Sequence, residues 1–187
     1  MDLKTESAWQ RLNGIFDRFW LDQINGPKLW NDGADHNKLR FYKTLKASFT
    51  QETYVTNILN KSQRAWLTRY RVRAVSNLGI ESGRYTRPVT PVSFRVCSYC
   101  NSIDDERHAI LLCQTFTSKL NCFFGKLSCH ITKKIQLSQT DQLLTILCPS
   151  TPEIALCVSK YLGIISETRN KLDKGLSIDM LNSYCKI

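Results

Sequence analysis

Apolar residues recur at intervals of three and four along much of the chain, which is the pattern of amphipathic helices. Residues 7–30 carry such a repeat, and Gly26 followed by Pro27 is expected to end it. The repeated apolar positions are Trp9, Leu12, Ile15, Phe16, Phe19 and Trp20. We expect this aromatic face to pack in a core rather than to stack on bases, because helical spacing is what burial of one face requires.

The helical pattern returns after a polar loop at residues 31–37, in which His36 is expected to be exposed rather than a ligand. Three short helices are predicted between residues 38 and 78, and glycines at 79 and 83 interrupt the pattern. Further helices are predicted near residues 120–127 and 143–147. The longest helix is expected to begin at Pro152, since proline is favoured in the first helical turn, and to run to about Asp173.

One run has a different period. After Pro91, the residues Val92, Phe94 and Val96 alternate with polar residues, which predicts a short strand in a small hairpin. The predicted fold is therefore mainly α, a helical-bundle-like chain with a small zinc-bound β-hairpin or knuckle inserted near the middle. Its expected segments are an N-terminal helix and loop (1–37), a basic helical segment (38–90), a zinc-binding knuckle (91–118) and C-terminal helices (119–187).

The knuckle segment contains a group of metal-ligating residues. Cys97 and Cys100 are separated by two residues, and His108 and then Cys113 follow within the next thirteen positions. A Cys-x-x-Cys turn supplies two thiolates from one short stretch of backbone, and zinc favours four such ligands in a tetrahedron. We therefore predict a zinc site with these four ligands. Four protein ligands leave no open position for an activated water, so the site is expected to be structural rather than catalytic.

Helix geometry adds a further expectation for this site. The acidic run 104–106 is expected to open a helix, where negative charge suits the unsatisfied amides of the first turn. In a regular helix His108 and Cys113 would point about 140° apart, because they are five residues apart. Both cannot then face one ion. We predict that the helix loosens or ends just before Cys113.

Several other interpretations of these residues are weaker. Cys97 and Cys100 could be buried thiols near a core histidine, or a redox pair, but no βαβ pattern surrounds them. A second ion could be held by Cys122, Cys129 and His130. The pair at 104 and 105 resembles the carboxylates of a polymerising centre, yet a helix cap explains it better. There is no phosphate-binding glycine loop and no Ser/His/Asp set, so we do not expect an enzyme.

Positive charge is concentrated in one part of the chain. The net charge is +10, and residues 38–95 alone hold twelve basic and two acidic side chains. A localised field of this sign indicates a polyanionic partner, most simply RNA or DNA. Trp66, Tyr70 and Tyr85 lie nearby for stacking on bases. The predicted contact residues are Arg64, Arg69, Arg71, Arg73, Arg84, Arg87 and Arg95. The alternative is an ordinary solvated face, which the near-absence of balancing acid disfavours.

No run of about 18 apolar residues occurs, and the first ten residues are mixed and charged. These features predict an intracellular chain, in the nucleus or cytoplasm, with neither a membrane nor a small-molecule substrate as partner. In a reducing compartment the eight cysteines are better explained by metal binding than by disulfides.

Four stretches together resemble a known family. They are Leu67 to Pro88, Arg95 to Cys100, Asp105 to His108, and Leu111 to Cys113. They are similar to the C-terminal zinc-binding region of reverse transcriptases from non-LTR (LINE-like) retrotransposons, in which a basic segment precedes a cluster of cysteine and histidine. The similarity is densest over residues 38–116, about half of the chain. It implies the same four zinc ligands and a role in binding element RNA or target DNA near the polymerase.

The resemblance does not extend to catalysis. The polymerase fingers and palm with their catalytic aspartates have no counterpart in the sequence, and neither does an endonuclease. We therefore expect a non-catalytic, zinc-dependent nucleic-acid-binding module, a truncated remnant or separate reading frame of such an element, with a polymerase domain as a possible partner in trans. The alternative from a different class is a zinc-stabilised protein-interaction scaffold.

Overall fold

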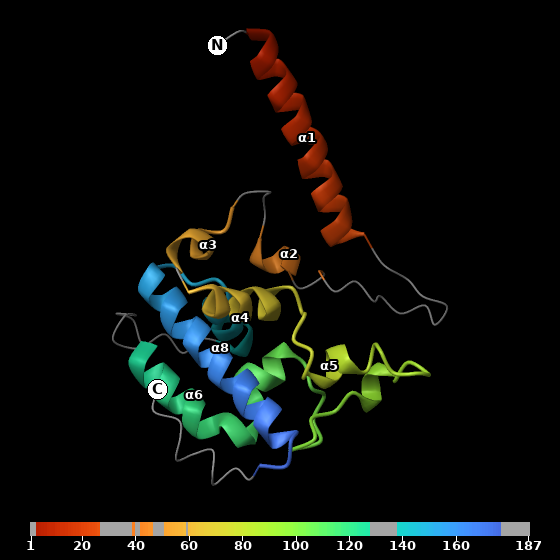
Figure 1. Ribbon diagram of the computed structural model, residues 1–187, viewed down its shortest axis with the longest axis vertical. Helices are drawn as coiled ribbons and strands as arrows, with labels where there is room; N and C mark the ends of the chain where they lie inside the picture. The colour runs from red at the N-terminus through yellow and green to blue at the C-terminus, as the bar shows by residue number, and fades with distance from the viewer. Residues whose placement is uncertain are drawn as a thin grey trace. The chain divides into compact units, whose positions relative to one another are not determined.

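The computed structural model describes residues 3–26, 39, 42–46, 51–58, 60–127 and 138–176 (Figure 1). The chain divides into two compact units, Met1–Glu52 and Thr53–Ile187. Both are built from helices, and no strand occurs in the residues that the structure describes. The predicted α-helical class is thus confirmed. The division into four segments stays a prediction.

The first unit contains α1 (Leu3–Asn25) and the short α2 (Tyr42–Leu45). The helix α1 ends where the Gly26 amide donates to the Asp22 carbonyl at 2.9 Å, as the Gly-Pro pair predicted. The rings of Trp20 and Tyr42 meet edge to face, with centroids 6.5 Å apart. The Tyr42 hydroxyl also donates to Glu52 at 3.0 Å.

The predicted burial of the aromatic face of α1 is largely wrong. Four of its side chains are exposed, namely Leu12, Ile15, Phe16 and Phe19. Ile24, near the end of the helix, is buried. Among the described residues of the first unit the other helix is α2, a single turn that cannot bury a helix face of this length. The side chain of Trp9 lies outside the described residues.

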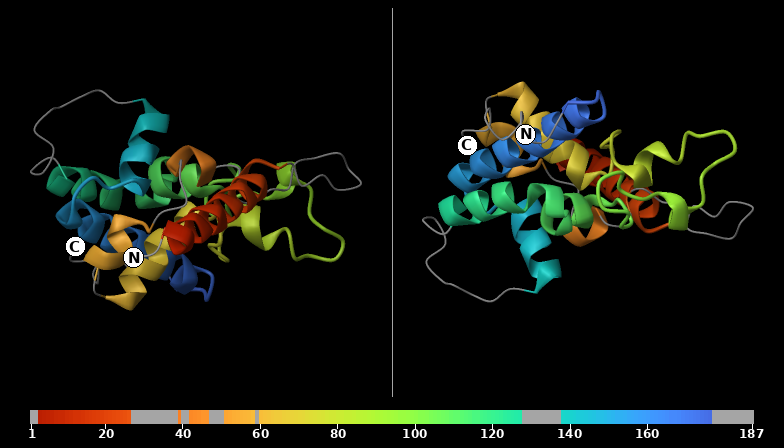
Figure 2. Two further views of the ribbon diagram at one scale, coloured as in Figure 1. Left: turned by 90° about the horizontal axis from the view of Figure 1, so that it is seen from above. Right: turned by 90° about the horizontal axis from the view of Figure 1, so that it is seen from below.

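In the residues that the structure describes, the second unit contains six α-helices and three shorter helical turns. The α-helices are α3 (Thr53–Asn57), α4 (Lys61–Arg71), α5 (Gly79–Ser82), α6 (Thr117–Leu127), α7 (Gln139–Leu147) and α8 (Pro152–Leu172). The turns are the 3₁₀-helices η2 (Val92–Phe94) and η4 (Gln114–Phe116) and the π-helix η3 (His108–Leu112). Their arrangement places α8 at the centre, beside α4 and α6 (Figures 1 and 2).

The central helix α8 begins at Pro152, as predicted, and the Thr151 hydroxyl caps it by accepting from the Ile154 amide at 3.3 Å. Its buried face organises the core. Tyr161 stacks on Phe123 with centroids 4.3 Å apart, and its hydroxyl donates to the Ile110 carbonyl at 2.7 Å. These contacts hold α6 and the π-helix η3 against α8.

Among the described helices, none is by itself long and apolar enough to cross a membrane. Taken together α7 and α8 reach that length and composition, but they are bent by 106° at the break between them.

The predicted strand and hairpin are wrong. Residues Val92–Phe94 form a 3₁₀ turn, in which the Phe94 amide donates to the Pro91 carbonyl at 3.0 Å. A single antiparallel bridge joins Val96 to Ile103. The alternating apolar residues had the period of a strand, but a strand needs a partner over several residues, and here pairing is confined to this one bridge.

Residue 83 must be glycine because the side chain of Arg95 packs directly against its backbone. An added Cβ would lie 2.7 Å from Cγ of Arg95, whose guanidinium is held by the carbonyls of Thr90 (2.7 Å) and Ile80 (3.1 Å). Arg95 cannot move aside without losing these bonds. We expect Gly83→Ala to lower the free energy of unfolding by about 1–3 kcal/mol in urea denaturation.

The control for this substitution is Gly14→Ala in α1, where an added Cβ meets nothing within 4 Å. Alanine in a helix interior is expected to leave stability unchanged or slightly raised. Equal stability of Gly83→Ala and the wild type would contradict the close approach of Arg95.

Candidate metal centre

The four predicted ligand residues lie together in the second unit. One ligand atom from each of Cys97, Cys100, His108 and Cys113 falls within a group whose members are all within 4.8 Å of one another. The Cys97 and Cys113 sulfurs are 3.9 Å apart, and the Cys100 sulfur is 3.2 Å from Nε2 of His108. Two thiolates on one tetrahedral zinc would be separated by about 3.8 Å, given Zn–S bonds of about 2.3 Å. The cluster could therefore bind a metal such as zinc.

The first two ligands are presented by a tight turn. The Asn101 amide donates to the Cys97 carbonyl at 2.9 Å, and the Cys97 amide donates to the Ser102 carbonyl at 2.8 Å. Asn101 adopts a left-handed backbone with φ of 57°, a region that asparagine tolerates better than most residues. The turn thereby places the thiols of Cys97 and Cys100 on the same side.

The last two ligands are brought together by the π-helix η3. The Cys113 amide donates to the His108 carbonyl at 2.8 Å, five residues back, instead of four as in an α-helix. The wider turn returns residue 113 to the side of the helix that carries residue 108. This confirms the prediction that the helix loosens before Cys113.

The three acidic residues before this helix have different roles. Asp105 caps the helix, because its carboxylate accepts from the His108 amide at 2.8 Å. Asp104 instead pairs with Arg169 of α8 in a buried contact, and Glu106 pairs with Arg73 at 3.0 Å. The predicted capping role is thus confirmed for one residue and wrong for the other two, which are buried charges with their own partners.

The buried pair of Asp104 and Arg169 fastens the knuckle to α8. The Asp104 carboxylate also accepts from the Gly79 amide at 2.7 Å, while Arg169 donates to the Asn77 carbonyl at 3.1 Å. Tyr99, inside the Cys-x-x-Cys turn, lies with its ring 5.6 Å from the Arg169 guanidinium. The metal-ligand turn is therefore packed into the second unit and is not a separate zinc finger.

The ligand side chains differ in their protonation. Burial lowers the pKa of His108, which favours the neutral imidazole that binds metals. Burial raises the pKa of the Cys113 thiol to about 12. For Cys100, burial works in the same direction, but hydrogen bonds from Ser102, Cys97 and Cys113 outweigh it and hold the pKa below its usual value. A bound cation would be needed to hold the Cys113 thiol deprotonated.

Three of the seven arginines predicted to contact nucleic acid are buried, so for these the prediction is wrong. Arg71 donates to the Leu147 carbonyl, and its guanidinium lies 5.4 Å from the Tyr54 ring. Arg73 pairs with Glu106, and Arg95 lies across Gly83. Each guanidinium is bound by groups of the protein and has no surface on which to meet a phosphate.

The other four predicted arginines reach the surface to different extents. Arg69 is exposed over the Trp66 ring at 4.8 Å, and Arg87 is exposed in the loop after α5. Arg64 and Arg84 are half-buried; Arg64 donates to the Ile58 carbonyl at 2.7 Å, and Arg84 pairs with Glu81 at 3.3 Å.

The three aromatic residues predicted to stack on bases also differ. Tyr70 is buried and its hydroxyl lies 3.1 Å from that of Ser166, so it is a core residue. Tyr85 is exposed and Trp66 is half-buried.

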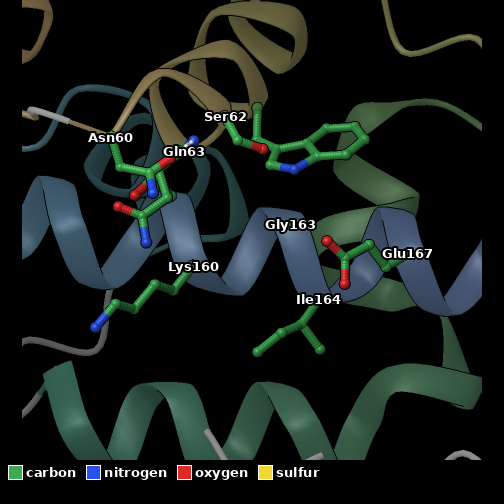
Figure 3. A pocket seen from close by; sticks show the side chains of 9 residues that line it. Asn60, Ser62, Gln63, Lys160, Gly163, Ile164 and Glu167 are labelled. Atoms are coloured by element: carbon green, nitrogen blue, oxygen red, sulfur yellow. Dashed lines mark hydrogen bonds between the residues drawn. The ribbon is translucent and has the colours of Figure 1, made fainter.

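Trp66 borders a groove of about 480 Å³ between α4 and α8. Figure 3 shows Asn60, Ser62 and Gln63 on one side of the groove and Lys160, Gly163 and Glu167 along α8. No local pattern in the sequence predicts this groove, because its two walls come from segments far apart in the chain.

Two weaker predictions cannot be compared with the structure. Cys129 and His130, proposed as partners of Cys122 at a second ion, lie outside the described residues, and so does His36. Within the described part of the chain, the cluster of Cys97, Cys100, His108 and Cys113 is the one group of this kind.

Comparisons of the chain with known protein families, with curated proteins and with solved structures find no match.

Proposed function

We propose that the chain is a non-catalytic nucleic-acid-binding module whose fold depends on one zinc ion held by the knuckle cluster. The observation that carries the proposal is the convergence of four ligand atoms within 4.8 Å, beside a segment that has surface arginines and no acidic residue from Ser82 to Ile103. Zinc with four protein ligands would supply stability rather than an activated water.

The ligand geometry supports zinc over a set of chance thiols. Three sulfurs and one imidazole nitrogen match the donors that zinc prefers, and the described cysteines are all free of disulfides. Nearby, Arg169 retains its charge: burial acts against it, but Asp104 and then Cys97 raise its pKa above the usual value. A buried cation next to the thiolates would offset part of the negative charge of a Cys₃His zinc site.

The charge distribution supports a polyanionic partner. Phosphate contacts need guanidinium groups that a nucleic acid can reach, and Arg69 and Arg87 are both exposed. The resemblance to the C-terminal region of LINE-like reverse transcriptases favours RNA or DNA as that partner, with a polymerase domain in trans. We infer no chemistry for the module itself.

Salt-dependent binding tests this function. The double variant Arg69→Gln, Arg87→Gln is expected to bind single-stranded nucleic acid more weakly than the wild type. The slope of log affinity against log salt should also fall by about 1.4, because each phosphate contact contributes about 0.7 for a single strand. Fluorescence anisotropy with a labelled oligonucleotide over a range of salt concentrations measures both.

The matched control removes the same charge elsewhere. Lys171 and Lys174 are exposed at the end of α8, and their replacement by glutamine should leave the slope closer to that of the wild type. Equal loss in the two double variants would mean that only net charge matters. A wild-type protein that binds no nucleic acid at low salt would refute the proposal.

A protein-interaction scaffold remains the second candidate, and one observation favours it. Ile15 and Phe19 of α1 are 55% and 62% exposed, which is unusual for large apolar side chains in one amphipathic helix. A scaffold would keep its partner when Arg69 and Arg87 are replaced and lose it when Ile15 and Phe19 are replaced.

A further inference from the structure

The knuckle has an inner and an outer face because its two arms are extended around the bridge. The inner face consists of the buried residues Arg95, Cys97 and Asp104. The outer face of the knuckle consists of three exposed apolar side chains, Phe94, Val96 and Ile103. Successive side chains of extended backbone point to opposite sides, so Val96 and Ile103 are separated from the buried Arg95, Cys97 and Asp104. Apolar groups are thus outside and charged groups inside, the reverse of an ordinary surface turn.

Two of the outer side chains form a cross-strand pair. The Cys97 amide donates to the Ser102 carbonyl (2.8 Å) and the Asp104 amide to the Arg95 carbonyl (2.9 Å), on either side of Val96 and Ile103. Residues enclosed in this way are the non-hydrogen-bonded pair of an antiparallel ladder, whose side chains approach most closely. Val96 and Ile103 therefore make one continuous apolar surface. Phe94, at the end of the adjoining 3₁₀ turn η2, is also exposed.

The loop after α5 and the arms of the knuckle together form one lobe, residues 83–103. The Thr90 amide donates to the Gly83 carbonyl at 3.1 Å, and the hydroxyls of Thr86 and Thr90 lie 2.8 Å apart, which closes the loop just before η2. Tyr85 on this loop is 66% exposed and Phe94 is 72% exposed. The segment projects away from α4 and α8 (Figures 1 and 2). Two large aromatic rings are thus presented on one projecting lobe.

The charge of the lobe restricts its partner. Residues 82–103 contain three arginines and no acidic residue. Arg95 is directed inward, so Arg87, together with the part-exposed Arg84, carries the positive charge of the surface. Aromatic rings next to cations match a strand of unpaired nucleotides, which offers flat bases for stacking and phosphates for charge. A duplex would hide its bases from these rings.

We propose that the outer face of the knuckle binds the unpaired bases of a single-stranded nucleic acid, with Phe94 and Tyr85 stacking on bases and Arg87 contacting the backbone. This inference rests on the proposed nucleic-acid-binding function and names the surface that performs it. It centres the interface on the lobe formed by residues 83–103, because Arg71 of α4 and Arg73 just after it are buried.

Phe94→Ala separates stacking from charge. Removing a ring that stacks on a base is expected to weaken binding of a labelled oligothymidylate by roughly 10- to 100-fold. The salt slope should stay that of the wild type, because no phosphate contact is lost. Arg87→Gln should do the opposite and lower the slope by about 0.7 with a smaller loss at high salt. Binding of a duplex should be the same for Phe94→Ala and wild type.

Two controls accompany the measurement. Phe94→Trp keeps an aromatic ring and should retain binding, while Leu156→Ala removes an exposed apolar side chain of α8 outside the lobe and should change nothing. Phe94 is largely exposed, so the Phe94→Ala protein should keep its helical circular dichroism and its zinc content. Photo-cross-linking with 5-iodouracil should mark Phe94 or Tyr85.

The possible outcomes are distinct. Salt-dependent binding by the wild type with unchanged affinity in Phe94→Ala would overturn this inference and leave the proposed function standing. An equal loss for the duplex and the single strand would also overturn it. No binding by the wild type would instead refute the proposed function itself.

Discussion

Replacing Cys100 with serine is expected to abolish stoichiometric zinc binding and to unfold the knuckle. Wild-type protein should contain one zinc per chain by elemental analysis, and Cys100→Ser should contain little. A structural zinc site of this type contributes on the order of 10 kcal/mol to folding, so the variant should also lose most of its thermal stability. A chelator should lower the melting temperature of the wild type and have little further effect on the variant.

Cys122→Ser is the matched control, because Cys122 is an exposed cysteine of α6 outside the cluster. Zinc content and melting temperature should not change. If Cys122→Ser lost zinc as well, a second ion would be indicated. If purified wild-type protein took up no zinc, the four groups would be buried thiols beside a histidine, and the metal part of the proposed function would be wrong.

Arg169→Met is expected to cost about 3–5 kcal/mol in the free energy of unfolding, which is the range for breaking a buried ion pair by removing one partner. The substitution leaves the Asp104 carboxylate without its cation in an environment where both side chains are almost fully inaccessible. It also removes the donor to the Asn77 carbonyl. Urea or guanidinium denaturation monitored by circular dichroism gives the value.

The double variant Arg169→Met, Asp104→Asn distinguishes an unpaired charge from lost packing. An asparagine can still accept from the Gly79 amide but carries no charge, so part of the stability should return. Lys171→Met, two residues along α8 and exposed, should change stability by less than about 1 kcal/mol. A loss of that small size for Arg169→Met itself would show that the pair behaves like a surface salt bridge.

The four metal ligands could be predicted because they lie close together in the sequence. The ligands lie within 17 positions, and the expected loosening before Cys113 follows from the angle between helix positions. The start of α8 at Pro152 is local in the same sense. Zinc itself stays a prediction.

The wrong predictions have a common cause: each depended on contacts with residues far away in the sequence. Arg73 pairs with a carboxylate 33 residues away and Arg71 with a carbonyl 76 residues away, so their sequence neighbours gave no sign of burial. The strand predicted from Val92, Phe94 and Val96 is wrong because, in the residues that the structure describes, its pairing is confined to the bridge between Val96 and Ile103. The predicted burial of the aromatic face of α1 was wrong for a similar reason. Periodicity indicates that a helix has an apolar face but does not indicate which segment covers that face.

The contacts of Arg169 bear on the order in which the second unit folds. Cys97 and Cys113 are 16 residues apart, whereas Arg169 and Asp104 are 65 residues apart. Closing the longer loop costs about 1 kcal/mol more in chain entropy, and it needs α8 already formed. We therefore expect the four ligands to gather around their ion early, while the chain is still open. Docking of α8 would follow, so that a local event prepares the surface on which the long-range core is completed.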